Sequence, residues 1–253
     1  MEISLIIFAL ISGVLNGIGS SGGMLFMSAM LLNGFHPIVA TATNKVVALI
    51  GSFGALKNYW LYSEKIENNK GLYILSVTGV LLGASLALKF DEGTLGKAYC
   101  ILTFLLLVAL LLSHKFKGVS IEKNKGGLKR RKLFIGMFSG AYNGFFGPGT
   151  IIVASLQFRI LANCKDKEGI STAVTLNTIT NAAACFVLGV GILSVLEVEV
   201  FLLSALILSN IVGQYFGSLF VVRSDAKYVE FVSKATVFIL LIVLVNEYWF
   251  RFY

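Results

Sequence analysis

Long stretches without any charged side chain constrain this chain more than any other feature. Residues 3–44 contain no Asp, Glu, Lys or Arg, and the same holds for residues 133–158, 169–196 and 200–222. A helix that crosses the hydrocarbon core of a bilayer needs about 20 apolar residues. The 253-residue chain is 57% hydrophobic and 13% charged, with a mean hydropathy of +0.84, which leaves almost no room for a soluble domain. We therefore predict an all-α polytopic membrane protein that has the lipid bilayer as a partner.

The apolar segments form two sets of four on either side of a basic linker. Eight of the 21 basic residues lie within residues 115–132. A basic cluster beside membrane spans is typical of a cytoplasmic topology determinant, so no nucleic-acid partner is expected. We predict a first membrane repeat at residues 1–114, a basic cytoplasmic linker at 115–132 and a second membrane repeat at 133–253. The eight predicted segments lie at about residues 3–32, 38–60, 71–90, 97–114, 133–160, 170–193, 198–221 and 228–250.

A short phrase occurs twice in the chain, 127 residues apart. Residues 13–17 read Gly-Val-Leu-Asn-Gly, and residues 140–144 read Gly-Ala-Tyr-Asn-Gly. Each copy runs into a glycine-rich interruption of an apolar segment, at residues 18–23 and 145–150. Interrupted apolar segments at corresponding positions of two halves indicate the binding site of a transporter.

The two interrupted segments either cross the membrane as broken helices or enter and return as re-entrant hairpins. If every segment crosses, the side of the linker carries 12 basic residues and the other side 9. If the two interrupted segments are hairpins, the counts become 17 and 4. Because cytoplasmic loops are enriched in Lys and Arg, the hairpin arrangement is favoured. Each half then crosses three times, so the halves are inverted repeats and both termini face away from the cytoplasm.

The two interruptions supply the first candidate binding residues. Helices that begin at such breaks direct free N–H groups and a partial positive charge toward the membrane interior, so the expected substrate is a small anion. Close helix packing through small residues is the alternative explanation of the glycines. The candidates are Asn16, Ser20, Ser21, Gly22 and Gly23 in the first half, and Asn143, Gly147, Pro148, Gly149 and Thr150 in the second.

A second polar cluster follows each interrupted segment. The hydroxyl groups of Thr41 and Thr172 either cap the next helix or line a polar path. Asn177 and Asn181 are one helical turn apart and share a face, where substrate binding and interhelical hydrogen bonding are equal alternatives. The candidate residues of this cluster are Thr43, Asn44, Lys45, Thr172, Asn177 and Asn181.

Lys45 is the most unusual residue of this cluster. It lies about eight residues inside an apolar segment, and its counterpart in the second half is Val174. A charge within a membrane span is costly and indicates a functional site. The alternative is a lysine that extends its side chain to the membrane interface.

Catalytic chemistry is not predicted. The chain has two histidines, both near turns, and neither an H-E-x-x-H sequence nor a P-loop occurs. We expect a protein that is not an enzyme, with no catalytic residues, no metal site and no cofactor.

Residues 13–23 with 42–45, and residues 140–150, resemble the TauE/SafE family of membrane proteins, the sulfite-exporter type. The resemblance implies a secondary transporter of a small anion, a sulfur oxyanion or an organosulfonate such as sulfite or sulfoacetate, in a bacterial inner membrane. Many relatives carry Asp where this chain has Asn16 and Asn143. The amides remove two negative charges from the predicted site and also remove a route for proton coupling.

Two other functions remain open at this stage. An anion channel would expose its path to both sides at once, whereas a transporter exposes its site alternately. A structural membrane subunit would transport nothing. The sequence specifies neither the substrate, the direction nor the coupling ion, and it is compatible with a homo-oligomer without requiring one.

Overall fold

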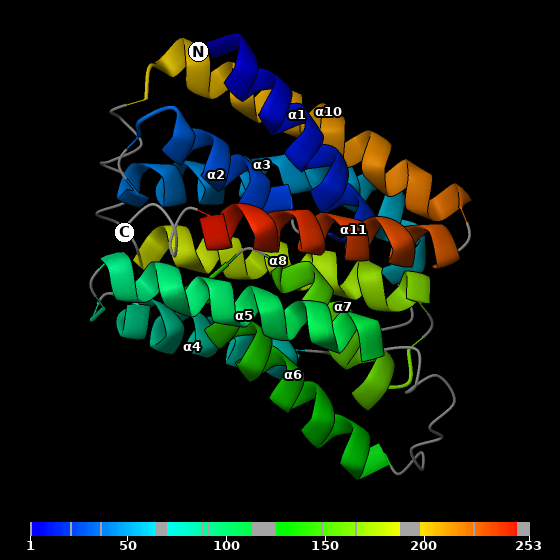
Figure 1. The fold of residues 1–253 in the computed structure, drawn as a ribbon. Helices are drawn as coiled ribbons and strands as arrows, with labels where there is room; N and C mark the ends of the chain where they lie inside the picture. The colour runs from blue at the N-terminus through cyan, green and yellow to red at the C-terminus, as the bar shows by residue number, and fades with distance from the viewer. Residues whose placement is uncertain are drawn as a thin grey trace.

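The computed structural model describes residues 2–20, 22–35, 37–63, 70–87, 89–90, 92–112, 125–147, 149–164, 166–187, 198–224 and 226–246. Within these residues the regular structure is helical and contains no strand, so the predicted all-α class is confirmed. The helices, labelled in Figure 1, are α1 (Glu2–Ile18), α2 (Gly22–Leu32), α3 (Pro37–Ser63), α4 (Lys70–Ala87), α5 (Glu92–Leu112), α6 (Lys125–Phe145), α7 (Thr150–Leu161), α8 (Asp166–Val187), α10 (Val200–Arg223) and α11 (Ala226–Val245).

Three of the described helices are long and apolar enough to cross a membrane. These spans are Val39–Trp60 within α3, Lys70–Ala87 in α4 and Val200–Arg223 in α10. Shorter apolar helices accompany them, among them α1, α2 and α7. Large apolar side chains cover the outside of the bundle. Such a surface is suited to contact with lipid, and its exposure to water is unfavourable. Examples are Phe53, Trp60, Ile74, Leu82, Phe104, Phe201, Leu208, Phe216 and Phe231.

Both predicted interruptions are present. The break between α1 and α2 contains Gly19, whose φ is 89°. The break between α6 and α7 contains Gly147 and Gly149, with φ values of 88° and 82°. Only glycine adopts this left-handed region without strain, which explains why each long apolar segment stops being helical at these positions.

Each interrupted segment folds back on itself as a helical hairpin. The Ser12 hydroxyl on α1 donates a 2.7 Å hydrogen bond to the carbonyl oxygen of Gly22 on α2. The Ser139 hydroxyl on α6 donates a 2.9 Å hydrogen bond to the Gln157 side chain on α7. In one continuous helix, residues 18 apart would be separated by about 27 Å. We call α1 with α2 the first hairpin, and α6 with α7 the second hairpin.

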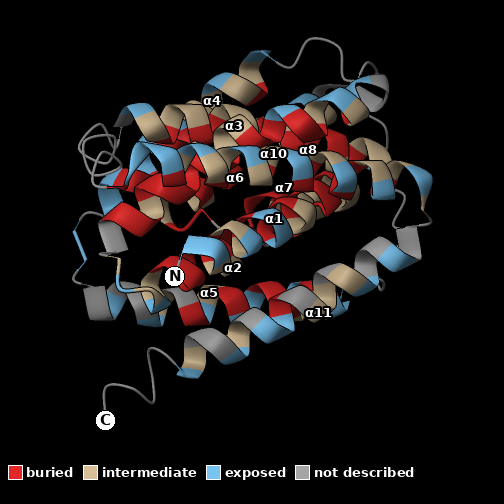
Figure 2. Ribbon diagram, turned by 90° about the horizontal axis from the view of Figure 1, so that it is seen from above, coloured by how far each residue is buried: buried red, intermediate tan, exposed pale blue. Residues whose placement is uncertain are grey.

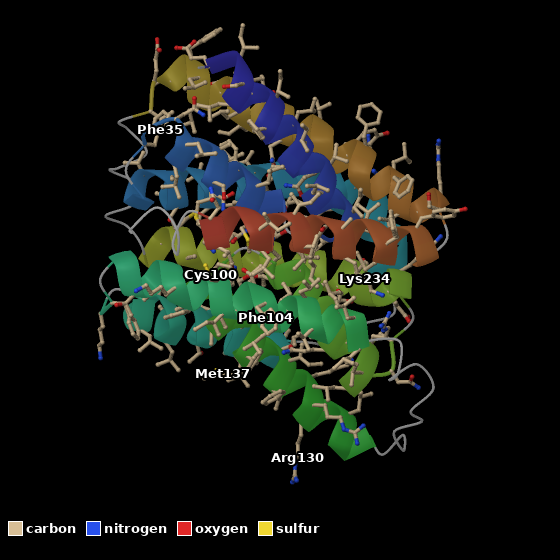
Figure 3. The ribbon with its side chains drawn as sticks, viewed as in Figure 1. Phe35, Cys100, Phe104, Arg130, Met137 and Lys234 are labelled. Atoms are coloured by element: carbon tan, nitrogen blue, oxygen red, sulfur yellow. The ribbon has the colours of Figure 1, made fainter. Side chains whose placement is uncertain are left out.

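The second hairpin begins earlier in the chain than predicted. Helix α6 starts at Lys125, whereas the predicted segment starts at residue 133. The helix therefore takes up the last part of the predicted linker, and Arg130 projects from it away from the bundle (Figure 3). Lys, Arg and Leu are good helix formers, but a search for apolar runs cannot detect a helical turn made of charged residues.

The strongest helix pairs join the two halves of the chain. Helix α1 packs along α10, and α6 packs along α4. Helices α2 and α3 complete a first helix group with α1 and α10, while α7 and α8 complete a second helix group with α4 and α6. The main contact between the two groups is α3 against α8. Helices α5 and α11 pack on each other at one side of the bundle (Figure 2).

Glycines permit the close approach within these pairs. A Cβ atom added to Gly13 would lie 2.5 Å from the backbone oxygen of Asn210 on α10. A Cβ atom added to Gly140 would lie 2.0 Å from the backbone oxygen of Ser76 on α4. Small residues that let helix backbones meet are a common basis of packing in membranes. For the glycines of the repeated phrase, the packing explanation therefore applies.

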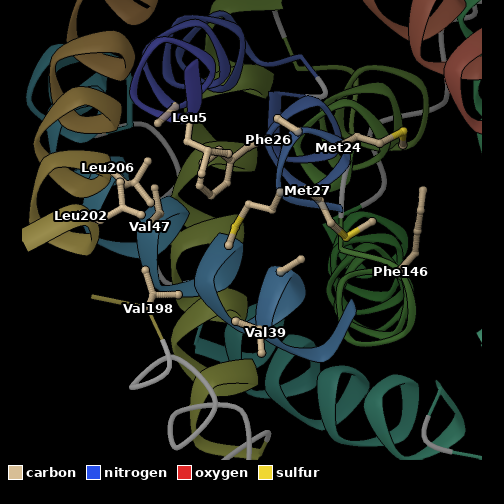
Figure 4. Packing of buried hydrophobic residues seen from close by; sticks show 14 of the residues in the cluster. Leu5, Met24, Phe26, Met27, Val39, Val47, Phe146, Val198, Leu202 and Leu206 are labelled. Carbon is tan, nitrogen blue, oxygen red and sulfur yellow. The ribbon is translucent and has the colours of Figure 1, made fainter. Parts of the chain in front are cut away.

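A hydrophobic cluster positions the first break. Phe26 on α2 is fully buried among Leu5 of α1, Val47 of α3 and Leu206 of α10 (Figure 4). These side chains hold the short helix α2 against the other three helices of its group. The start of α2 is thereby fixed in the interior of the bundle.

Candidate functional site

A small polar cavity of about 20 Å³ lies between the two hairpin breaks and helices α3 and α8. A cavity of this size has room for about one water molecule. Its walls are formed by Asn16, Ser20, Gly23, Asn44, Lys45, Ala48, Gly147, Gly149, Thr150, Ile151, Asn177 and Asn181.

The first break is organised by a side chain from the preceding helix. The Asn16 amide oxygen accepts a 3.1 Å hydrogen bond from the backbone N–H of Gly23, in the first turn of α2. First-turn N–H groups have no acceptor within their own helix, so this contact supplies one from outside. The same break places Ser20 at the cavity wall.

The hydroxyl group of Ser20 has no hydrogen-bond partner among the described residues. The side chain is 1% exposed and lines the cavity. An unpaired buried hydroxyl costs about 1–3 kcal/mol. A bound ligand that accepts a hydrogen bond from this hydroxyl would remove that cost. The hydroxyl of Thr43, which is fully buried, is also unpaired within the described chain, but Thr43 does not line the cavity.

The second break is organised by its own backbone. The Thr150 hydroxyl donates to the carbonyl oxygen of Gly147, and the N–H of Val153 donates to the carbonyl oxygen of Gly149 at 3.0 Å. Helix α7 therefore starts directly at the cavity, where Gly149 and Thr150 form part of the wall. The starts of α2 and α7 both bring the positive end of a helix dipole to this region.

The ammonium group of Lys45 reaches from α3 across to the second helix group. Its Nζ atom donates to the backbone oxygen of Asn143 at 3.0 Å, to the side-chain oxygen of Asn143 at 2.6 Å and to the side-chain oxygen of Asn181 at 3.4 Å. The residue is only 5% exposed. An extension to the membrane interface is therefore wrong for Lys45, because its charge lies inside the bundle.

The absence of a side chain at Gly147 makes room for this ammonium group. A Cβ atom at Gly147 would lie 2.5 Å from Lys45 Nζ. In the described part of the chain, every hydrogen bond of Lys45 goes to a neutral oxygen atom. A buried cation without a counter-ion costs several kcal/mol, and it favours the arrival of a negative charge.

Asn143 connects Lys45 to helix α8. Its amide nitrogen donates to the Thr180 hydroxyl at 2.6 Å and to the side-chain oxygen of Asn181 at 3.1 Å. Sequence reasoning missed Thr180, because nothing in an apolar helix distinguishes a threonine that meets a residue 37 positions earlier. Its spacing next to Asn181 is the one signal that could have found it.

Ten of the sixteen predicted site residues line the cavity. Asn143 lies behind it as the partner of Lys45, and Gly22 packs against α1, where an added Cβ would lie 2.0 Å from the Ser12 oxygen. Thr43 and Thr172 also lie outside the wall.

Two of the predicted residues, Ser21 and Pro148, fall outside the described residues. Ala48 and Ile151 line the cavity without having been predicted, since apolar residues carry no polar signal. The binding role of all these residues stays a prediction.

Helix capping is wrong as an explanation of the two threonines. Helix α8 begins at Asp166, so Thr172 lies in its second turn and donates within the helix to the Glu168 oxygen at 2.8 Å. Thr41 lies in the second turn of α3 and contacts the Met27 sulfur at 3.7 Å. Helix α8 starts four residues before the predicted segment because its first turn, Asp-Lys-Glu-Gly, contains no apolar residue, whereas α3 starts only one residue before the predicted segment.

The arrangement as a whole is suited to holding a small anion. One ammonium group, one free hydroxyl and two helix starts converge on the cavity, and no carboxylate belongs to the described wall. In the described part of the chain, no three His, Cys, Asp or Glu side chains cluster closely enough to hold a metal ion.

Interrupted helices that meet around a polar cavity inside an apolar bundle define a class, the membrane transporters. The chain belongs to the sulfite exporter TauE/SafE family, whose match extends over residues 5–246. This is a family of membrane transporters, so the resemblance seen in the sequence is confirmed.

Several curated proteins are similar to the chain. A probable membrane transporter protein, ORF9, of Sinorhizobium is 31% identical over 62% of this chain and 60% of its own length. A probable membrane transporter protein of Haemophilus influenzae is 26% identical over 71% of each chain. The probable membrane transporter protein YfcA of Escherichia coli K12 is 28% identical over 72% of this chain and 68% of its own length. The matching region thus spans less than two thirds of the Sinorhizobium protein. No solved structure matches the chain.

Proposed function

We propose that this protein is a secondary transporter that binds a small anion in the cavity between the two breaks. The observation that carries the proposal is the Lys45 ammonium group, which is buried beside the cavity and surrounded only by neutral oxygen atoms among the described residues. Such a cation attracts an anion more strongly in the low-dielectric interior than it would in water. The free Ser20 hydroxyl offers the anion a hydrogen-bond donor.

The proposed substrate is a sulfur oxyanion or an organosulfonate. Support for this class comes from the name of the family, sulfite exporter TauE/SafE. The polar walls of the cavity are suited to a small anion, and the cavity of about 20 Å³ would widen to admit it. The names of the curated relatives specify no substrate.

Alternating access is proposed to occur by movement of the two helix groups against each other. The first hairpin belongs to one group and the second hairpin to the other, so the cavity lies where the groups meet. The contact between α3 and α8 is the main junction that would rearrange. The inside-negative membrane potential would assist the exit of an anion by about 2.3 kcal/mol per charge per 100 mV.

The proposed topology is an inverted repeat in a bacterial inner membrane. Two features support it: α1 enters the bundle from one side and α6 from the opposite side (Figure 1), and the pair α1–α10 corresponds to the pair α6–α4. In this arrangement the basic linker is cytoplasmic, and both termini are extracytoplasmic.

The proposal is tested by flux of sulfite, sulfate and sulfoacetate in proteoliposomes. The decisive variant is Gly147→Ala, because the new Cβ would displace the Lys45 ammonium group 2.5 Å away. Its matched control is Gly34→Ala, because Gly34 has a similar φ of 85° but an added Cβ would have no atom of the described residues within 4 Å. Both changes strain the backbone by about 1–2 kcal/mol.

We expect sulfite or sulfoacetate flux in the wild type, a loss of at least tenfold in Gly147→Ala and little change in Gly34→Ala. Flux that is absent for all three anions would contradict the proposed substrate class. Counterflow separates a transporter from a channel, since only a transporter accelerates exchange when substrate is present on the far side.

A further inference from the structure

All three N–H donors of the Lys45 ammonium group are already used. A lysine ammonium has three donors and no acceptor. Its three partners are the two oxygen atoms of Asn143 and the side-chain oxygen of Asn181. An anion that enters the cavity therefore finds the positive charge but no free N–H on it. To bind the ammonium directly, the anion must take the place of one of these oxygen atoms.

The contact with Asn181 is the weakest of the three. It measures 3.4 Å, against 3.0 and 2.6 Å for the two contacts with Asn143. Asn181 lines the cavity, whereas Asn143 does not. The exchangeable oxygen is thus the one that has the longest contact with the ammonium group and that belongs to a residue of the cavity wall.

Release of this contact leaves no buried oxygen without a partner. The Asn181 oxygen also accepts a 3.1 Å hydrogen bond from the amide nitrogen of Asn143. An unsatisfied buried acceptor would cost about as much as a new hydrogen bond contributes, but here the second donor prevents that cost. An anion accepts a hydrogen bond from an ammonium group more strongly than a neutral amide oxygen does, so the exchange favours the anion.

We propose that Asn181 is an internal competitor of the transported anion for the Lys45 ammonium group, and so sets the affinity of the site. This inference rests on the proposed function. Asn181 holds the ammonium while the cavity is empty, and the anion displaces it on binding. Because Lys45 is on α3 and Asn181 on α8, each exchange also opens one hydrogen bond between the two helix groups. Substrate binding and the loosening of the α3–α8 junction are thereby the same event.

The test measures sulfite binding to the purified full-length protein in nanodiscs by titration calorimetry. Asn181→Ala removes the competitor, so we expect affinity to rise about three- to tenfold. Asn181→Asp has the same shape but places a carboxylate beside the ammonium group, so we expect affinity to fall at least tenfold. The control is Asn163→Asp, which adds the same charge at an exposed position outside the cavity wall and should bind as wild type does.

The outcomes separate this inference from the proposed function. If the wild type binds sulfite but Asn181→Ala binds it equally or more weakly, or Asn181→Asp binds it as tightly as wild type, Asn181 is only a structural residue and the inference fails. If the wild type binds neither sulfite nor sulfoacetate, the proposed function fails and the inference fails with it. Thermal unfolding of each variant verifies that it is folded, and in a Lys45→Met background the Asn181→Ala change should raise affinity no further.

Discussion

Two serines of the first hairpin differ in whether their hydroxyl groups have partners. Ser12 donates to the Gly22 oxygen and so ties α1 to the start of α2. Ser20 is buried at the cavity wall with no partner among the described residues. The first hydroxyl stabilises the fold, and the second is available to a ligand.

The two serines therefore predict opposite effects. Ser12→Ala should lower the free energy of unfolding by about 1–3 kcal/mol, because the Gly22 oxygen loses its buried donor. Ser20→Ala should leave stability unchanged or slightly higher, yet weaken sulfite binding by about tenfold. Thermal unfolding and calorimetric titration of both variants provide the comparison. A strongly destabilised Ser20→Ala protein would show that the hydroxyl has a structural partner.

At the scale of residues, the sequence predicted the polar groups better than their partners. Lys45 was identified because an isolated charge in an apolar segment is conspicuous. Its bond to Asn143 joins residues 98 positions apart, and no local pattern encodes such a contact. The same applies to Thr180, whose importance depends only on what lies opposite it.

At the scale of helices, the repeated phrase combines two separate requirements. Its asparagines, Asn16 and Asn143, stabilise the break or the Lys45 ammonium group. Its glycines let α1 approach α10 and let α6 approach α4. The two requirements occur together because the same helix turn faces a neighbouring helix on one side and the break or the Lys45 ammonium group on the other. The sequence showed the repeat but could not assign each residue to its face.

The glycine contacts predict which substitution a helix pair tolerates. Gly140→Ala would place a methyl group 2.0 Å from the Ser76 backbone oxygen, so the two helices must separate. Among the described residues, the new methyl group of Gly71→Ala, on the same α4–α6 pair, meets only the Leu133 side chain at 2.8 Å, which can rotate. We expect Gly140→Ala to cost about 1–3 kcal/mol and lower the melting temperature by roughly 2–12 °C, with little change for Gly71→Ala. Equal melting temperatures would contradict close packing at Gly140.

At the scale of the whole molecule, the helix groups differ from the repeats. The predicted halves divide the chain at the basic linker, but α10 packs with α1, and α4 packs with α6. Hydropathy and repeats predicted the helices and both breaks, because these follow from composition along a short window. They could not predict that α1 and α6 each pack against a helix from the other half, because this packing depends on glycine surfaces that meet only after folding.

The proposed topology predicts where reporter domains will be active. Fusions near Lys125 should report a cytoplasmic position, and fusions after Tyr253 an extracytoplasmic one, because three crossings in each half change the side. The measurement is the activity of paired reporters that each work on only one side of the membrane. A cytoplasmic C-terminus would exclude the inverted arrangement.

The pairing of α1 with α10 also has a consequence for biosynthesis. From Ile18 to Val200 the ribosome adds 182 residues, which takes roughly 10–40 s at about 5–20 residues per second. During that delay the glycine face of α1 and its broken, polar end must remain in the membrane without the helix that will cover them. We therefore expect that the insertion machinery or α3 covers this surface of α1 until α10, in the last third of the chain, has been translated.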